Sequence, residues 1–283
     1  MNKQTSLDIG ASGIRLIVSD LDGTLLNASS VFARRTLQAV RAVREKGIAF
    51  TVCTGREYAM LGWFLRELDL DVPVICNNGA EVIHPVTGQV YMRQLLPKEE
   101  SRRLLHHCMA EGIDFCLTTP TAAYFPVGSG LTGFYEDYEA MAAREGIAGF
   151  PVRYLSSALE MEALEHNKII FRTDLPGYRQ ARDFVERHCP EMEFTTSSKL
   201  IADIIPRGVS KAGGLAAAAR IMGIPPQACC AFGDFENDIP MFRFCGLSFA
   251  MGNAHEDVRR AATLVAPPNS SDGVAQMLEQ YII

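Results

Sequence analysis

Two aspartates near the N-terminus have the spacing expected of a metal and phosphate site. Asp20 and Asp22 follow a short apolar run that begins at Ile14, and Gly23 permits the chain to turn away from that run. Open parallel sheets bind ligands beyond the carboxyl ends of their strands. There, one carboxylate and one backbone carbonyl could converge on a hard cation. The alternative is an Asx turn in which Asp22 caps the segment that follows.

A second acidic pair lies far along the chain. Asp234 and Asp238 follow the apolar run 228–232, and both could face one point at the junction of a strand and a helix. Carboxylate oxygens are the ligands that Mg²⁺ prefers, usually with substrate phosphate and water completing its coordination. The alternative is a capped helix whose acidic first turn is solvated, which would explain this pair by itself.

Two further sites could hold a phosphate. Thr54 and Gly55 follow the strand-like run 48–53 and precede a helical pattern, so a hydroxyl and a flexible backbone N–H meet at a helix N-terminus. Lys211 stands in the first turn of a helix that Ser210 caps, where the helix dipole disfavours a cation unless an anion is bound nearby. Taken singly, the two sites are better explained by an ordinary helix start and a solvated lysine.

The four sites gain meaning together, because all of them follow strands in an alternating pattern of strands and helices. Short strands spaced by single helices imply right-handed crossovers and a parallel sheet, so the four sites can converge at one edge. The four aspartates would repel one another unless a cation lay among them. Lys211 and the Thr54 loop would then balance a phosphate.

The order of the expected elements divides the chain. The parallel pattern stops after residue 84 and resumes near residue 193, and between them the pattern is an irregular mixture of hairpins, strands and helices. We therefore expect an α/β protein with a Rossmann-like parallel-sheet core at 13–84 and 193–283. An α+β cap is inserted at 85–192, and residues 1–12 form a flexible tail.

Composition narrows the classes of partner. The chain has 283 residues, 48% of them apolar, with a formal net charge of −6 and a pI near 5.6. It has no basic stripe and no apolar run long enough to span a bilayer, so we expect neither nucleic acid nor a membrane as partner. Its eight cysteines show no metal-binding spacing and fall mostly in apolar runs, which favours reduced thiols and the cytoplasm.

Four motifs follow one another in a fixed order. They are DLDGTL at 20–25, TGR at 54–56, GVSK at 208–211 and GDFEND at 233–238. On these residues, and on the runs NNGA, MGNA and DGVA, the chain resembles the haloacid dehalogenase (HAD) superfamily. Within it, the chain is similar to the Cof-type, class IIB branch of sugar-phosphatase-like enzymes. Members of that branch carry a cap between the second and third motifs, where the insert lies.

The resemblance implies a role for each motif residue. Asp20 would be the nucleophile that forms an aspartyl phosphate, and Asp22 the general acid and then base. Mg²⁺ would be held by four aspartates: Asp20, Asp22 through its carbonyl oxygen, Asp234 and, in support, Asp238. The transferring phosphoryl group would be held by Leu21, Thr54, Gly55, Lys211 and Asn237.

The implied activity is magnesium-dependent hydrolysis of a small phosphorylated metabolite, a sugar phosphate or similar compound, by a monomer or homodimer. One alternative is a phosphomutase of the phosphomannomutase type, in which the aspartyl phosphate passes to a second hydroxyl. Another is a catalytically silent sensor of a phosphate ligand, which should have lost a motif residue, whereas none is missing. Substrate specificity is expected in the cap. Its candidate residues could contact the leaving group, but packing in the core or on the surface explains each of them better: Tyr124, Phe125, Tyr135, Tyr138, Arg144 and Arg153.

Overall fold

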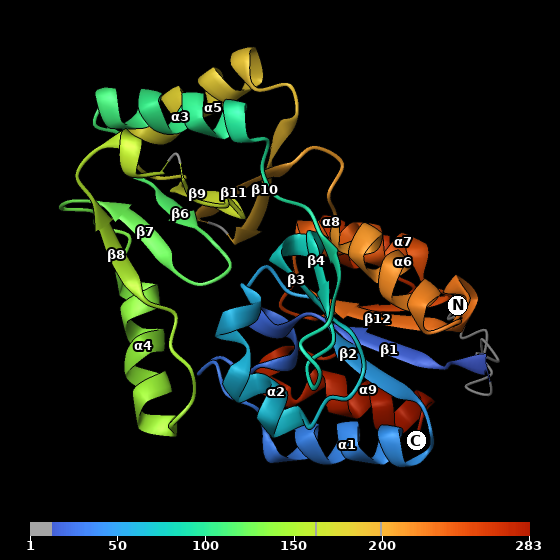
Figure 1. Ribbon diagram of the computed structural model, residues 1–283. Coiled ribbons are helices and arrows are strands. Elements are labelled where there is room, and N and C mark those ends of the chain that lie inside the picture. Colours follow the sequence, from blue (N-terminus) through green and yellow to red (C-terminus); the bar gives the residue numbers. More distant parts are fainter. Residues whose placement is uncertain (1–12, 162, 199) are drawn as a thin grey trace.

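The protein consists of a core and a cap. The computed structural model describes residues 13–161, 163–198 and 200–283, and the predicted tail at 1–12 lies outside these ranges. In Figure 1 the core, with β1, β12 and α1, lies below and to the right of the cap, which carries α3 and α5 at the top and α4 at the left. The C-terminus lies on the core.

The core is built on a parallel sheet of five strands in the order β14-β13-β12-β1-β2. Their bounds are β1 Leu16–Ser19, β2 Ala49–Val52, β12 Cys229–Gly233, β13 Leu247–Ala250 and β14 Leu264–Val265. An isolated parallel bridge between Cys53 and Ile75 joins β2 to an antiparallel group of three strands. That group comprises β3 Val74–Cys76, β4 Glu81–Ile83 and β5 Val90–Arg93.

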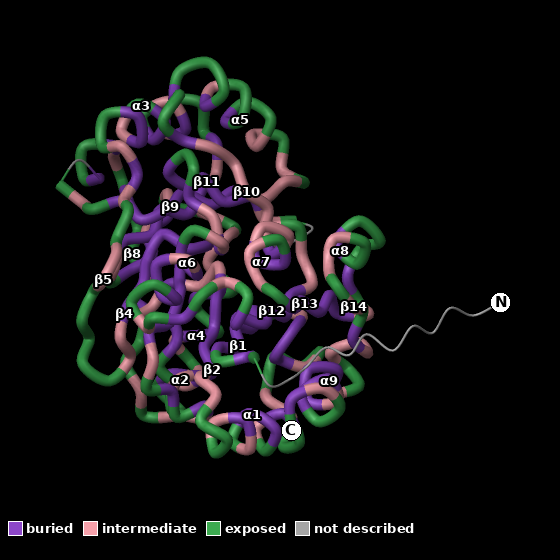
Figure 2. Tube along the Cα trace, turned by 90° about the vertical axis from the view of Figure 1, so that its right-hand side faces the viewer, coloured by how far each residue is buried: buried purple, intermediate pink, exposed green. Residues whose placement is uncertain are grey.

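Helices cover both faces of the core sheet. On one face lie α1 Arg34–Glu45, α2 Gly62–Leu68 and α9 Gly273–Tyr281, and on the other α6 Lys211–Ile221, α7 Ile239–Phe244 and α8 Glu256–Ala261. Strand β1 explains this arrangement, because its side chains alternate: Ile17 packs toward the first group, and Leu16 and Val18 pack toward the second. A strand buried on both faces therefore reads as a continuous apolar run. Figure 2 shows β1, β12 and β13 as buried tube inside the core.

The cap is a mixed six-stranded sheet in the order β10-β11-β9-β6-β7-β8. Its strands are β6 Cys116–Thr118, β7 Ala123–Pro126, β8 Val152–Leu155, β9 Lys168–Arg172, β10 Met192–Ser198 and β11 Ile201–Pro206. Its helices are α3 Lys98–Ala110, α4 Gly133–Glu145 and α5 Gly177–His188. Helices α3 and α5 pack on one face of the sheet with Leu117 and Ile169, and α4 packs on the other with Cys116 and Ile170.

The fold class predicted from the sequence is confirmed, and the strand pairing bears on where the cap begins and ends. Strands β10 and β11 pair with each other and with β9, so residues 193–206 belong to the cap sheet and not to the core. Residues 85–93 stay beside the core, because β5 pairs with β4. We therefore propose residues 94–206 as the cap.

Two properties expected from composition can be compared with the structure. All eight cysteines are free, and seven of them are buried. Within the described ranges, no helix is long and apolar enough to cross a membrane.

Candidate active site

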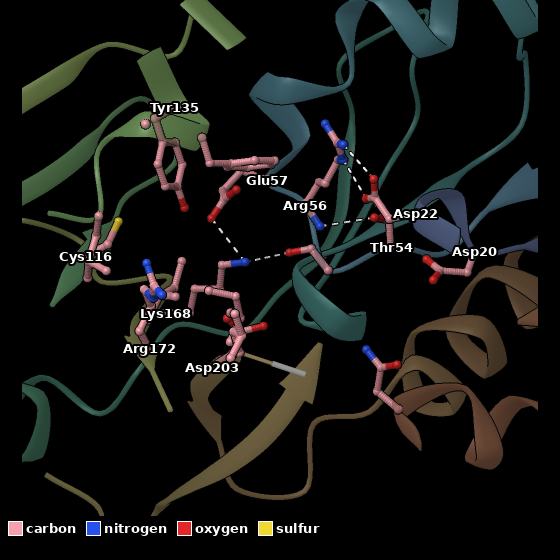
Figure 3. Close-up of a pocket in the computed structure, with 18 of the residues that line it drawn as sticks. Asp20, Asp22, Thr54, Arg56, Glu57, Cys116, Tyr135, Lys168, Arg172 and Asp203 are labelled. Atoms are coloured by element: carbon pink, nitrogen blue, oxygen red, sulfur yellow. Dashed lines mark hydrogen bonds and ion pairs between the residues drawn. The ribbon is translucent and has the colours of Figure 1, made fainter. Parts of the chain in front are cut away.

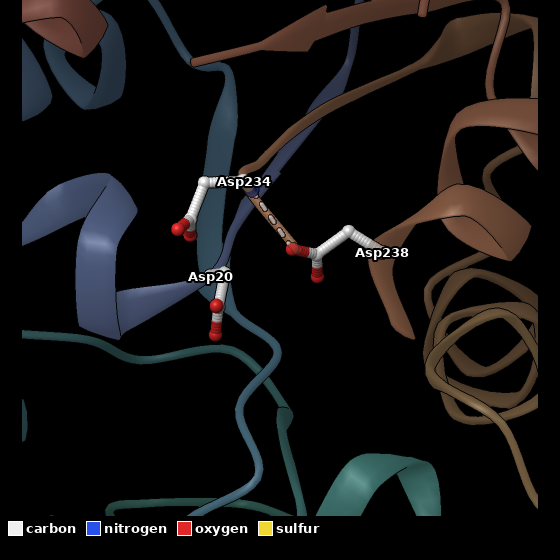
Figure 4. Close-up of side chains that lie close together, drawn as sticks. All are labelled: Asp20, Asp234 and Asp238. Atoms are coloured by element: carbon white, nitrogen blue, oxygen red, sulfur yellow. Dashed lines mark hydrogen bonds between the residues drawn. The ribbon is translucent and has the colours of Figure 1, made fainter. Parts of the chain in front are cut away.

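Three aspartates meet beyond the carboxyl ends of β1 and β12. Asp20 follows β1, and Asp234 and Asp238 stand in the segment between β12 and α7. Each offers one carboxylate oxygen to a group in which all three atoms lie within 4.8 Å of one another. Figure 4 shows the three side chains close together, with the Asp238 carboxylate directed at the backbone of Asp234. The structure thus brings together residues that are more than 200 positions apart in the sequence.

Buried Lys211 balances part of this negative charge. Its Nζ lies 3.0 Å from Asp20 Oδ1 and 2.6 Å from Asp238 Oδ1, and its side chain is 1% exposed. Burial opposes the charge of this ammonium group, but Asp20 and Asp238 raise its pKa above the ordinary value. Lys211 therefore remains a cation, and three carboxylates against one ammonium leave a formal excess of two negative charges.

That excess disfavours full ionisation of the carboxylates. Burial, with repulsion from Asp238 and Asp234, raises the pKa of Asp20 well above its usual range, although Lys211 opposes the shift. Burial and Asp238 raise the pKa of Asp234 to about 7. A divalent cation held by these hard oxygen donors would relieve the repulsion, so the residues fit Mg²⁺.

The carboxylates differ in how much of their hydrogen-bonding capacity is already used. Asp238 Oδ2 accepts the backbone N–H groups of Asp234 (2.9 Å) and Phe235 (3.0 Å), while its other oxygen faces Lys211. Asp238 is thus engaged on both oxygens, which suits a supporting role. Asp234 Oδ1 accepts the Thr24 hydroxyl at 2.7 Å.

Gly23 permits the close approach of these two loops. Its φ is +78°, and a Cβ at this position would lie 2.3 Å from Asp234 Oδ2. Any other residue would therefore push Asp234 out of the cluster. Asn253 Nδ2 donates to the Gly23 carbonyl at 2.9 Å, which holds the loop in place.

The predicted phosphate loop lies beside the cluster. The Thr54 hydroxyl oxygen accepts the Arg56 backbone N–H at 3.1 Å, and Thr54 is 1% exposed. Asn237 Nδ2 donates to Asn78 Oδ1 at 2.9 Å, which ties the segment after β12 to the segment after β3. Leu21 is fully buried, so it can reach a phosphate only through its backbone.

Asp22 is paired with Arg56. Arg56 Nε and one terminal nitrogen donate to the two Asp22 carboxylate oxygens, both at 2.7 Å. The guanidinium lies between two aromatic rings, 4.8 Å from the centroid of Phe64 in the core and 5.2 Å from that of Phe134 in the cap. The motif signalled Arg56, but nothing in the sequence near it signalled Phe134.

A cavity of about 600 Å³ lies between core and cap. Both predicted catalytic aspartates line it, as do Thr54, Gly55, Lys211 and Asn237. Figure 3 shows Asp20 at one end and Tyr135 and Cys116 of the cap toward the other. Of the cap residues considered from the sequence, Tyr135 lines this cavity, whereas Tyr138 donates its hydroxyl to the Ala59 carbonyl at 3.0 Å.

A parallel core with an inserted cap, and an aspartate cluster beside a buried lysine, are the features expected of a HAD hydrolase. The chain belongs to this family: the model of the haloacid dehalogenase-like hydrolases matches residues 17–278. The predicted family, its Cof-type class IIB branch and the hydrolase activity are thereby confirmed.

Individual relatives cover nearly the whole chain. The 5-amino-6-(5-phospho-D-ribitylamino)uracil phosphatase YwtE of Bacillus subtilis (strain 168) is 27% identical, over 95% of this chain and 98% of the relative. The pyridoxal phosphate phosphatase YbhA of Escherichia coli (strain K12) is 26% identical, over 95% and 99%. A solved subclass IIB sugar phosphatase of the superfamily superposes with a TM-score of 0.79 at 25% identity, over 95% of this chain and 100% of that one.

Proposed function

We propose that the chain hydrolyses a small phosphorylated metabolite through an aspartyl phosphate formed on Asp20, with Mg²⁺ as cofactor. The observation that carries this proposal is the position of Asp20. Its carboxylate lies at the cavity, 3.0 Å from a buried ammonium group and beside two further aspartates. No other described carboxylate combines these three features.

The metal would be held by Asp20, the Asp22 carbonyl and Asp234. When bound, Mg²⁺ neutralises negative charge so that the carboxylate of Asp20 and the phosphate can approach each other. Asp238 keeps Lys211 and the backbone of residues 234–235 in place around that site. This supporting role follows from the full use of its two oxygens.

The phosphoryl group would be bound by donors at the cavity, from Lys211, Thr54, Gly55 and Asn237, and from Leu21 beside it. The Lys211 ammonium stabilises the charge that develops on the phosphoryl oxygens in the transition state. The Thr54 hydroxyl accepts from Arg56 and still has its own hydrogen to donate. The backbone N–H groups of Leu21 and Gly55 and the Asn237 amide would complete the set.

Asp22 would protonate the leaving oxygen and then take a proton from the attacking water. In this structure both of its oxygens accept from Arg56, so one of those bonds must open before Asp22 can donate a proton. The Asp22 side chain is 49% exposed. Water can therefore solvate the carboxylate once a bond to Arg56 opens.

The relatives support the class of substrate. By their names, two act on 5-amino-6-(5-phospho-D-ribitylamino)uracil and pyridoxal phosphate, and a third is a sugar phosphatase. We therefore infer a small organic monophosphate for this chain as well. We also place the enzyme in the cytoplasm, in keeping with its buried free thiols.

The test is Asp20→Asn. This change keeps the size of the side chain but removes the nucleophile, so turnover of any phosphate ester should fall below detection while the fold is retained. Wild-type enzyme quenched during turnover should carry a phosphoryl adduct on Asp20, located by mass spectrometry. Asp69→Asn is the matched control, because Asp69 is 92% exposed and far from the cavity. Turnover by the Asp20 variant, with deamidation excluded, would contradict the covalent mechanism.

A further inference from the structure

The part of the cavity that would receive the organic leaving group of the substrate is called the organic end here. It contains three buried charged residues from three separate segments. Glu57 follows the phosphate loop, Lys168 begins β9, and Asp203 lies in β11. Their exposed fractions are 2%, 5% and 1%. Figure 3 shows the three side chains between the catalytic end of the cavity and Tyr135 and Cys116. We call Glu57, Lys168 and Asp203 the charged triad.

Lys168 is held from both sides. Its Nζ donates to the Gly55 carbonyl at 2.6 Å and lies 3.3 Å from Glu57 Oε1. Burial opposes its charge, but Asp203 and Glu57 raise its pKa, so it remains protonated. The charged triad therefore holds one cation and two carboxylates, an excess of one negative charge.

Each carboxylate of the charged triad has an oxygen that lacks a hydrogen bond. Asp203 Oδ2 accepts from Asn78 Nδ2 at 2.9 Å, but Asp203 Oδ1 is buried and accepts from no described group. Glu57 Oε1 faces Lys168 as an ion pair yet lies outside hydrogen-bonding geometry. Because a buried acceptor without a donor costs about 1–3 kcal/mol, these oxygens call for a donor from a bound molecule.

The arginines that line the cavity are already paired with carboxylates, Arg56 with Asp22 as described above. Arg172 also lines the cavity, and its guanidinium is paired with both oxygens of Asp174, at 3.0 and 2.6 Å. Burial raises the pKa of Tyr135 well above its ordinary value, so the phenol stays neutral. Leu131 and Ile170 add apolar surface. The organic end is thus acceptor-rich, partly apolar and negatively charged.

We propose that the charged triad selects a monophosphate whose leaving group presents O–H or N–H donors and carries no second anionic group. This inference rests on the proposed function, since it assigns the substrate class of the same cavity. A donor on the leaving group would satisfy Glu57 Oε1 or Asp203 Oδ1, whereas a carboxylate or second phosphate would meet like charge in a buried place. Like charges juxtaposed in a binding site are strongly disfavoured.

The experiment compares two ligands that differ only at the end far from the phosphate. Sorbitol 6-phosphate ends in a hydroxymethyl group and 6-phosphogluconate in a carboxylate. Both are titrated by calorimetry, with Mg²⁺, into the Asp20→Asn protein, so that binding is measured without turnover. We expect the acidic ligand to bind at least about tenfold more weakly, because one close like-charge contact costs more than the 1.4 kcal/mol that tenfold represents.

Two added substitutions test the residues themselves. Glu57→Gln and Asp203→Asn keep side-chain size but each removes a negative charge. Each should lower the ratio of the dissociation constant of 6-phosphogluconate to that of sorbitol 6-phosphate several-fold, and each should weaken the binding of sorbitol 6-phosphate. Asp183→Asn, on the exposed surface of α5, removes the same charge from the opposite face of the cap sheet and should change neither value. Circular dichroism and thermal unfolding check that both triad variants fold before their binding is compared.

The outcomes separate the two proposals. Equal binding of the two ligands, no binding of either at millimolar concentration, or an unchanged ratio in both triad variants would overturn the assignment of the charged triad. If one triad variant fails to fold, the other variant and the ratio in the Asp20→Asn protein still decide. Failure of the wild type to hydrolyse acetyl phosphate or any other ester would instead refute the proposed function, whatever the binding ratio.

Discussion

We predict that Asp234→Asn inactivates the enzyme and yet stabilises its metal-free fold. Burial and Asp238 raise the pKa of Asp234 from the ordinary value of 3.8 to about 7. At 1.36 kcal/mol per unit, keeping this carboxylate ionised in the fold costs about 4 kcal/mol above pH 7. Asparagine can still accept from the Thr24 hydroxyl, so the variant avoids that cost without losing this bond.

The sign of the pH dependence follows from the direction of the shift. Between pH 3.8 and about 7 the folded state binds more protons at Asp234 than the unfolded chain does, so wild-type stability falls as pH rises through that window. The advantage of the variant should therefore be near zero close to pH 4 and reach about 2–4 kcal/mol by pH 8. The lower value, 2 kcal/mol, applies if the partly open site relaxes around the ionised Asp234 carboxylate and so reduces the cost of its charge.

The assay is urea unfolding of wild type and variant in chelator at pH 5.5, 6.5 and 8, repeated with Mg²⁺ at pH 8. Bound metal should restore wild-type stability by mass action and leave the variant nearly unchanged. Asp69→Asn serves again as the exposed control. A variant that is no more stable than wild type in chelator at pH 8 would refute the account of the cluster as a site that needs a cation.

Three further outcomes are expected. Asp22→Asn should lower the rate of hydrolysis of a sugar phosphate by a factor of about 10²–10⁴. Formation of the aspartyl phosphate from acetyl phosphate, measured by rapid quench, should be spared because that leaving group needs little protonation. Equal losses on both substrates would contradict an acid role for Asp22. Burial lowers the pKa of His166, so this residue takes up a proton in the unfolded chain first as the pH falls. The free energy of unfolding should therefore decrease as the pH drops below about 6.5. His166→Gln should make the free energy of unfolding less dependent on pH between pH 6.5 and 5, and an unchanged dependence would contradict this account. Exchange of residues 94–206 for the cap of a relative should transfer substrate preference while turnover persists, and a folded chimera with the original preference would place specificity in the core.

Much of the core could be predicted because its signals are local. A strand buried on both faces is apolar throughout, as residues 16–18 are, and its polar residues appear where it ends. The position of Lys211 in the site was also indicated by a local signal, since a cation in the first turn of a helix suggested an anion nearby. The structure places Asp20, Asp238 and Lys211 in one buried group.

The cap boundary could not be predicted because it depends on a long-range pairing. Residues 201–206 lie just before Lys211 and alternate only weakly, so they read as a return to the core. Their assignment is decided by antiparallel pairing with β9, about 30 residues earlier, and no local pattern encodes that partner. The charged triad was missed for the same reason: Lys168 meets the Gly55 carbonyl across 113 positions.

The two passages between core and cap run past a single residue, Ala80. The outgoing chain is fixed there by the Gln94 N–H, which donates to the Ala80 carbonyl at 2.9 Å, and the returning chain packs Ile205 and Val209 against its side chain. Gly79 has a φ of +98°, and a Cβ on it would lie 2.0 Å from the Ser210 carbonyl oxygen. The two connections between core and cap therefore lie side by side, next to Ala80. We therefore expect that the cap can be lengthened, shortened or exchanged without changing the register of the core strands. One catalytic core could then carry very different caps, whether they arise in evolution or by protein engineering.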